Sequence, residues 1–85
     1  MAAIGTTKYV MCVDPQSELE YPILFPFHVW HHTFAPMNPV SAGFVSLDPL
    51  DGWQAFGKSV GLGIESREQD TMIIQRSLGQ TIKAK

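Results

Sequence analysis

A chain of 85 residues, 45% of them hydrophobic and 16% charged, is expected to form a single folded domain spanning residues 1–85. Its formal net charge of −2 gives it no electrostatic reason to bind nucleic acid or an anionic membrane surface, so neither is an expected partner. Cys12 is the single cysteine, which excludes an intrachain disulfide. A reducing, cytoplasmic location is therefore expected.

An uncharged stretch runs from Tyr21 to Leu47 and is long enough to cross a membrane as a helix. Prolines, an asparagine and three histidines interrupt it, so we expect no transmembrane helix. The first residues carry no basic leader, and we expect no signal peptide.

Two short extended segments are predicted in the first third of the chain. Lys8–Val13 is rich in β-prone residues and ends at an Asp-Pro turn signal, which indicates a strand. Tyr21–Phe25 is a second strand, and Pro22 near its start favours an edge position or the entry to the strand, because proline has no amide hydrogen to donate.

A short helix is expected after Pro26, over residues Phe27–Ala35. Proline is well tolerated at the first position of a helix, and Pro36 is expected to end this one. Residues spaced i, i+3, i+4 and i+7 would share one face of it: Phe27, Trp30, His31 and Phe34.

The next segments read as an antiparallel meander. Ser41–Leu47 is a predicted strand, and Asp48–Gly52 is a strong turn signal. Trp53–Phe56 and Ser59–Ile64 are predicted as further strands, with Gly57 as a bend or bulge between them.

Ser66–Leu78 is the clearest predicted helix. Ser66 followed by Gln69 fits a capping box, and Gly79 suits a left-handed cap at the other end. An apolar stripe spaced by four residues faces the sheet, made by Ile74, Leu78 and Ile82. The expected fold class is therefore α+β: a small, mostly antiparallel sheet of four to five strands, with the C-terminal helix packed on one face and a short helix after Pro26.

Residues Gly52–Ser59 match the phosphate-loop pattern G-x4-G-K-S. That loop needs a buried strand before it and a helix after it, because the helix N-terminus helps to hold the phosphates. Here a turn precedes the match, and a glycine-containing segment follows it. We therefore interpret the match as a coincidence within a β-hairpin.

The histidines and the cysteine are weak candidates for metal chemistry. On a helix, His28 and His32 would lie on one face at the spacing that lets two imidazoles bind one metal ion. Val29 occupies the position where a zinc protease carries its glutamate, and no third ligand is evident. We expect no metal, no cofactor and no catalytic residue, with Cys12 a buried and inert thiol.

Four polar residues form a candidate binding site for a small anionic ligand near the start of the C-terminal helix, whose free amides attract anions: Lys58, Ser59, Ser66 and Arg67. Anion or metal binding, by this group or by the His28/His32 pair, is the alternative function.

The leading functional prediction is a non-enzymatic interaction protein that forms a homodimer. Aromatic residues are abundant and charged residues scarce for so small a domain, and an exposed apolar patch usually marks an interface. The candidate interface residues are Phe27, Trp30, Phe34 and Trp53.

Three segments together resemble small uncharacterised proteins of bacteriophages and prophage-bearing bacteria: Phe25-Pro26 with the histidine segment, Pro39–Val45, and Gly57–Asp70. The resemblance implies no activity, cofactor or functional residue. It implies a phage accessory role, such as binding a host protein or sequestering a small host molecule.

Overall fold

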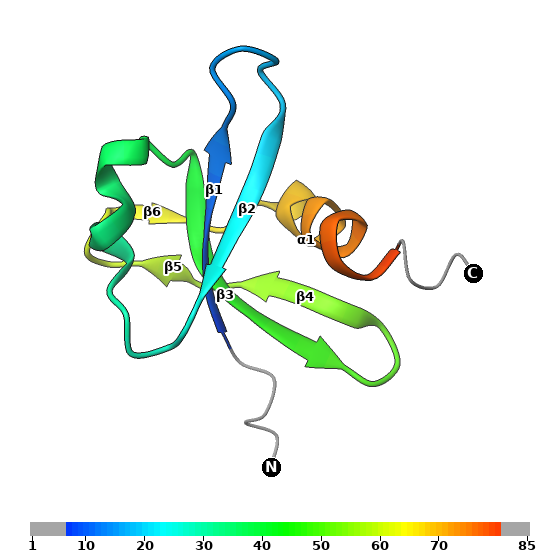
Figure 1. The fold of residues 1–85 in the computed structure, drawn as a ribbon. Coiled ribbons are helices and arrows are strands. Elements are labelled where there is room, and N and C mark those ends of the chain that lie inside the picture. Colours follow the sequence, from blue (N-terminus) through cyan, green and yellow to red (C-terminus); the bar gives the residue numbers. More distant parts are fainter. Residues whose placement is uncertain (1–6, 81–85) are drawn as a thin grey trace.

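A computed structural model describes residues 7–80, which form an antiparallel four-stranded sheet, a second two-stranded sheet and a C-terminal helix (Figure 1). The strands of the main sheet are β1 (Thr7–Val13), β2 (Glu20–Phe25), β3 (Ser41–Asp48) and β4 (Gly52–Phe56), in the order β2-β1-β3-β4. The small sheet pairs β5 (Lys58–Ser59) with β6 (Ile64–Glu65). The helical elements are the 3-10 helix η2 (His31–Met37), the α-helix α1 (Glu68–Gln75) and the π-helical turn η3 (Arg76–Gln80). The predicted α+β fold is confirmed.

Strand β1 lies at the centre of the molecule and is covered on both faces. Tyr9 and Met11 point toward α1, where they pack with Ile74. Val10 and Cys12 point to the opposite face, which η2 and the small sheet cover. Side chains alternate along a strand, so these two sets form two separate cores. The sheet is therefore the middle of three layers, as Figure 1 shows.

The outer edge of β4 is closed by side chains of α1. The hydroxyl oxygen Oγ1 of Thr71 accepts a hydrogen bond from the Ala55 amide at 3.0 Å. The side-chain amide of Gln75 donates to the Trp53 carbonyl at 2.8 Å. Two of the outward backbone groups that a further strand would use, the Ala55 amide and the Trp53 carbonyl, are thus already paired with the helix.

The other edge of the sheet, β2, is interrupted by Pro22. The Asp14 amide donates to the Leu19 carbonyl at 2.9 Å, which sets the hydrogen-bonding phase of the β1–β2 hairpin. In that phase the Met11–Pro22 pair is a non-hydrogen-bonded pair, so the proline nitrogen faces away from β1. The predicted edge position of Pro22 is therefore confirmed, and the proline removes one donor from the free edge.

The helix predicted over Phe27–Ala35 is wrong in position and type. Residues 27–29 form a turn, Trp30 is extended with φ −82° and ψ 141°, and the 3-10 helix begins at His31. Pro36 lies inside η2 and does not end it. The helix ends at Asn38, which is left-handed with φ 51° and donates its amide hydrogen to the Ala35 carbonyl. Tertiary packing of the His31 ring, described below, decides where the helix begins.

The strand predicted over Ser59–Ile64 is also wrong, because residues 60–63 form a turn between β5 and β6. Gly63 adopts φ +73°, a left-handed conformation that interrupts a strand. The predicted turn at Asp48–Gly52 is confirmed, with Asp48 Oδ1 accepting from the Leu50 and Asp51 amides.

The C-terminal helix packs on the sheet as predicted, but its ends differ. Its N-cap residue is Arg67 and not the predicted Ser66. The capping contact is made by Asp70, whose carboxylate accepts the Arg67 amide hydrogen, and not by Gln69 with Ser66. The chain continues past Gln75 into the π-helical turn through Gly79, whereas Ile82 lies outside the described residues. Among residues 7–80, no helix has the length and apolar character needed to cross a bilayer.

The chain passes from the main sheet to the small sheet through a close contact between two glycines. Gly57 has φ +80°, which confirms the predicted bend. A Cβ atom on Gly43 of β3 would lie 2.4 Å from the Phe56 carbonyl oxygen and 3.3 Å from Gly57. Only glycine at position 43 allows the backbone to pass this closely.

Candidate functional site

Four aromatic residues gather on the face of the sheet opposite α1, and we call this group the aromatic surface: Phe27, Trp30, Phe44 and Phe56. Phe44 and Phe56 are paired across β3 and β4, with ring centroids 5.8 Å apart. Phe27 stacks on the other side of Phe44, also at 5.8 Å. Phe27, Trp30 and Phe56 are 59%, 68% and 45% exposed, so most of this stacked group faces solvent.

Lys8 on β1 holds the loop that carries Phe27 and Trp30. Its ammonium nitrogen donates a hydrogen bond to the Val29 carbonyl at 2.9 Å. The same nitrogen lies 5.2 Å from the centroid of the Phe27 ring and 5.4 Å from that of Trp30, within cation–π range. Lys8 therefore orients the Phe27 and Trp30 rings, whose own segment is neither a helix nor a strand.

His31 anchors η2 to the sheet. Its ring is buried, and Nε2 lies 2.8 Å from the Gly43 carbonyl, an acceptor, so Nε2 carries the hydrogen. The edges of the Phe25 and Phe44 rings enclose it, each at 5.5 Å. Burial lowers the pKa of His31, and the positive charge of Lys8 lowers it further. The imidazole is therefore neutral near pH 7 and acts as a structural donor.

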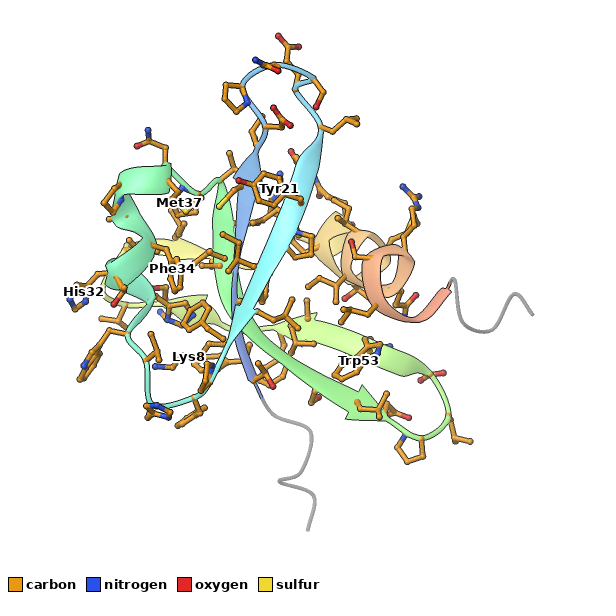
Figure 2. The ribbon with its side chains drawn as sticks, in the orientation of Figure 1. Lys8, Tyr21, His32, Phe34, Met37 and Trp53 are labelled. Atoms are coloured by element: carbon orange, nitrogen blue, oxygen red, sulfur yellow. The ribbon has the colours of Figure 1, made fainter. Side chains whose placement is uncertain are left out.

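Two of the four predicted interface residues lie on the aromatic surface, and two do not. Phe34 lies between η2 and the sheet, where its ring packs 4.5 Å from that of Phe25 (Figure 2). Trp53 lies on the opposite face, partly buried against the core under α1. The residues that sequence reasoning missed are Phe44 and Phe56, whose alternation with Val45 and Ala55 on paired strands was the available signal.

A hollow of about 180 Å³ adjoins the aromatic surface, between η2 and the β5–β6 turn. We call it the lysine hollow. Its lining includes Lys8 of β1, Trp30 and His32 from the η2 region, and Lys58, Ser59 and Gly61 from β5 and the turn after it. No carboxylate of residues 7–80 lines it. Lys58 and Ser59 come from the predicted anion site, whereas sequence reasoning missed Lys8, which lies 50 positions earlier in the chain.

A larger hollow of about 640 Å³ contains three of the four predicted ligand-binding residues: Lys58, Ser59 and Arg67. Ser66 is not part of its lining, and Glu65 adds a carboxylate to it. The Arg67 guanidinium is already engaged, at 2.6 Å from Glu20 and 2.8 Å from Asp70. The hydroxyl of buried Ser59 accepts the Leu62 amide at 3.2 Å. This arrangement offers an anion much less free positive charge than the sequence suggested.

A buried polar network joins β1, β2 and the start of α1. The fully buried carboxylate of Asp70 accepts hydrogen bonds from the Tyr9 hydroxyl at 2.5 Å, from the Arg67 amide at 3.0 Å and from the Arg67 side chain. Arg67 continues the chain to Glu20 with two further hydrogen bonds. Every polar atom of Asp70 is thus used within the fold, and the network is structural.

The pKa values in this network favour the ionised carboxylate. Burial alone would raise the pKa of Asp70, but the polar groups of Ser41, Tyr9 and Arg67 around it outweigh burial and lower it. Burial, together with the hydrogen bond to Asp70, raises the pKa of Tyr9 well above its usual range. The hydrogen bonds to Glu20 raise the pKa of Arg67. Tyr9 therefore stays protonated and Asp70 charged across the physiological range.

The structure does not bring the candidate metal ligands together. His28 lies in the turn before Trp30 and His32 in η2, so the shared helical face that the i, i+4 spacing predicted does not form. Within residues 7–80, no three histidine, cysteine, aspartate or glutamate side chains are grouped closely enough to hold a metal ion. Cys12 is buried on β1, and burial raises the pKa of its thiol.

The phosphate-loop match lies on strands. Residues Gly52–Phe56 form β4, and Lys58 and Ser59 form β5, with a turn and not a helix after them. The loop and the helix that bind phosphate do not form there. The predicted β-hairpin is wrong, because β4 pairs with β3 and β5 pairs with β6.

Comparison of the chain with protein-family models, curated proteins and solved structures finds no match in any of the three. The resemblance to bacteriophage proteins stays a prediction, and the chemistry of the site rests on its own geometry.

Proposed function

We propose that this chain is a non-enzymatic interaction protein that pairs with a second copy of itself through the aromatic surface. The observation that carries the proposal is the row of tilted rings of Phe27, Phe44 and Phe56 with Trp30 beside them, in which Phe27, Trp30 and Phe56 are exposed and Phe44 is partly buried. Exposed rings gathered on one face of a small domain are typical of a protein interface, in which aromatic residues are enriched.

The exposed area suits a small, reversible dimer. A fully buried aromatic side chain removes about 150–250 Å² from water, so the exposed parts of Phe27, Trp30 and Phe56 offer roughly 350 Å² per copy. A standard interface buries about 800 Å² per partner, and a little over half of that is apolar. The aromatic surface therefore supplies most of the apolar part of an interface at the low end of this size.

Charge placement favours a second copy as the partner. Lys8 of β1 lies next to the Phe27 and Trp30 rings of the aromatic surface. Asp48 and Asp51 lie at the tip of the β3–β4 hairpin, which carries Phe44 and Phe56. A two-fold pairing that runs the two hairpins in opposite directions brings the cation of each copy toward the acidic turn of the other. One chain thus carries both halves of a complementary contact.

Sedimentation equilibrium between about 5 and 200 µM tests the proposal, since a dimer of this size is expected to dissociate within that range. Trp30→Glu should give a monomer throughout, because it places a charge at the centre of the contact. Met72→Glu is the matched control: Met72 is also exposed, at 58%, but lies on α1 in the opposite layer. Circular dichroism verifies that both variants fold. A wild-type protein that is monomeric at all concentrations, or two variants that behave alike, would refute the proposal.

The phage accessory role is carried by the resemblance of sequence segments and not by the structure. In that role the same surface would also meet a host protein, or the chain would sequester a small host molecule. The cytoplasmic setting stays a prediction as well.

A further inference from the structure

The two lysines of the described chain line the same hollow. Lys8 comes from β1 and Lys58 from β5, and neither forms an ion pair with any of residues 7–80. The described arginines differ from them: Arg67 is held by Glu20 and Asp70, and Arg76 lies elsewhere, near Glu18. Two positive charges that no carboxylate of residues 7–80 pairs with thus line one small site in a protein of net charge −2.

The lysine hollow has donors to spare. The Lys8 ammonium has three N–H groups and gives one of them to the Val29 carbonyl, which leaves two for a ligand. Lys58 stands opposite Glu65 on the paired strand, but no ion pair joins them. Lys8 therefore offers the stronger contact, and the nearby carboxylate of Glu65 weakens the contribution of Lys58.

The same hollow has a flat aromatic wall. The Trp30 and His32 rings lie 6.1 Å apart and are inclined by 33°, and Phe44 is also part of the lining. The volume of about 180 Å³ equals roughly six water molecules at about 30 Å³ each, which is room for a single ring. A nucleotide, with its base, ribose and phosphates, is too large for it.

We infer that the lysine hollow binds a small aromatic anion, a single ring that carries a carboxylate or phosphate group. The ring lies against Trp30, and the anionic group lies between the ammonium groups of Lys8 and Lys58. All the residues of the site belong to one chain, so this inference does not rest on the proposed dimer. Lys8 and Trp30 also lie at the proposed dimer contact, so the ligand and a second copy would compete for them.

Phenyl phosphate is the probe, titrated at neutral pH and followed by the two tryptophan indole N–H signals in NMR spectra. The Trp30 signal should shift and saturate at millimolar probe, whereas the Trp53 signal, on the opposite face, should stay in place. Inorganic phosphate and phenol each carry one half of the probe and should bind at least about tenfold more weakly, since each half loses one type of contact.

Three variants test the lining. Lys8→Met should weaken binding about tenfold and Lys58→Met about threefold, as expected for charge-assisted contacts of unequal strength. Arg76→Met removes the same charge outside the hollow and should change nothing. Gly61→Leu should abolish binding, because a side chain there would first meet His32, 3.8 Å from its Cβ, and then fill the hollow.

Lys8→Met also removes the contacts that hold the Phe27–Trp30 loop, so weaker binding by this variant could come from the loop. Lys58→Met and Gly61→Leu are therefore the variants that decide the test. The inference is overturned if phenyl phosphate causes no saturable shift of Trp30, or if Arg76→Met weakens binding as much as Lys58→Met does. It is also overturned if Gly61→Leu binds like the wild type, or if inorganic phosphate binds as tightly as phenyl phosphate.

Discussion

Replacing Asp70 with asparagine removes a negative charge from a carboxylate that solvent does not reach. The carboxylate accepts hydrogen bonds on both oxygens: Oδ2 from the Tyr9 hydroxyl and the Arg67 amide, and Oδ1 from the Arg67 side chain. Asparagine keeps a single acceptor oxygen and places an N–H₂ group where the other oxygen was. Whichever way it turns, one set of donors then faces another donor.

The expected loss is about 3 kcal/mol. Removing one partner of a buried ion pair costs roughly 3–5 kcal/mol, because the remaining charge is left unpaired. Arg67 is 26% exposed and keeps its contact with Glu20, which places the expected cost at the low end of that range. A domain of 85 residues has a free energy of unfolding on the order of 8 kcal/mol, so the variant should lose a large share of its stability.

Urea denaturation at pH 7 measures this difference, and Asp51→Asn is the control. Asp51 is exposed, and its side chain forms no hydrogen bond with the described residues, so the same chemical change there should cost less than about 0.5 kcal/mol. If Asp70→Asn loses no more stability than Asp51→Asn, the network does not hold α1 to the sheet as we describe.

The pH dependence gives a second readout of the same reasoning. The pKa of Asp70 is lower in the folded protein, so its contribution to stability is fully present above the unfolded pKa of about 4. It is lost as the pH falls through the folded value. The stabilities of the wild type and of Asp70→Asn should therefore converge in acid. Curves that stay parallel down to that range would contradict the lowered pKa.

Two further predictions concern the opposite face of the sheet. Burial lowers the pKa of His31, so the unfolded chain takes up protons first and wild-type stability should decline as the pH falls below about 6.5. His31→Gln keeps a donor for the Gly43 carbonyl and should reduce this decline in urea titrations from pH 8 to 5. An unchanged slope would count against the lowered pKa of His31. Gly43→Ala should lower the free energy of unfolding by about 2 kcal/mol in thermal unfolding, because its Cβ would lie 2.4 Å from a backbone oxygen. Gly61→Ala is the control and should be nearly neutral, because no atom lies nearer than 3.8 Å to its Cβ. Equal effects of the two variants would show that the close contact at Gly43 is relieved at little cost.

The strands and the C-terminal helix could be predicted because their signals are local. The β-prone run Lys8–Val13 and the Asp-Pro and Asp-Gly turn signals act over a few residues. The helix before Pro36 was misplaced because its start depends on a contact between the His31 ring and the Gly43 carbonyl. The strand predicted over Ser59–Ile64 rested on the apolar residues of this segment. Gly61 and Gly63 within it indicated the turn that the structure shows between β5 and β6, and the prediction gave them too little weight.

The candidate site was only partly predictable because it joins distant segments. Lys58 and Ser59 could be chosen by residue type, but their partner Lys8 lies on a strand 50 positions away and reaches them only through the order β2-β1-β3-β4. The engagement of Arg67 depends equally on Glu20, 47 positions earlier. No spacing rule in a single sequence reports such pairings.

The closed edges of the main sheet limit how copies of this chain can assemble. Helix α1 uses Thr71 and Gln75 to pair two outward backbone groups of β4, and Pro22 interrupts the row of donors on β2. Strand-by-strand templating, the step by which fibrils elongate, needs an unbroken row of such groups. Both edges of the main sheet therefore hinder strand addition, whereas the side chains on its faces stay open to contact. A concentrated solution of the folded chain should therefore resist fibril growth even though aromatic rings are exposed.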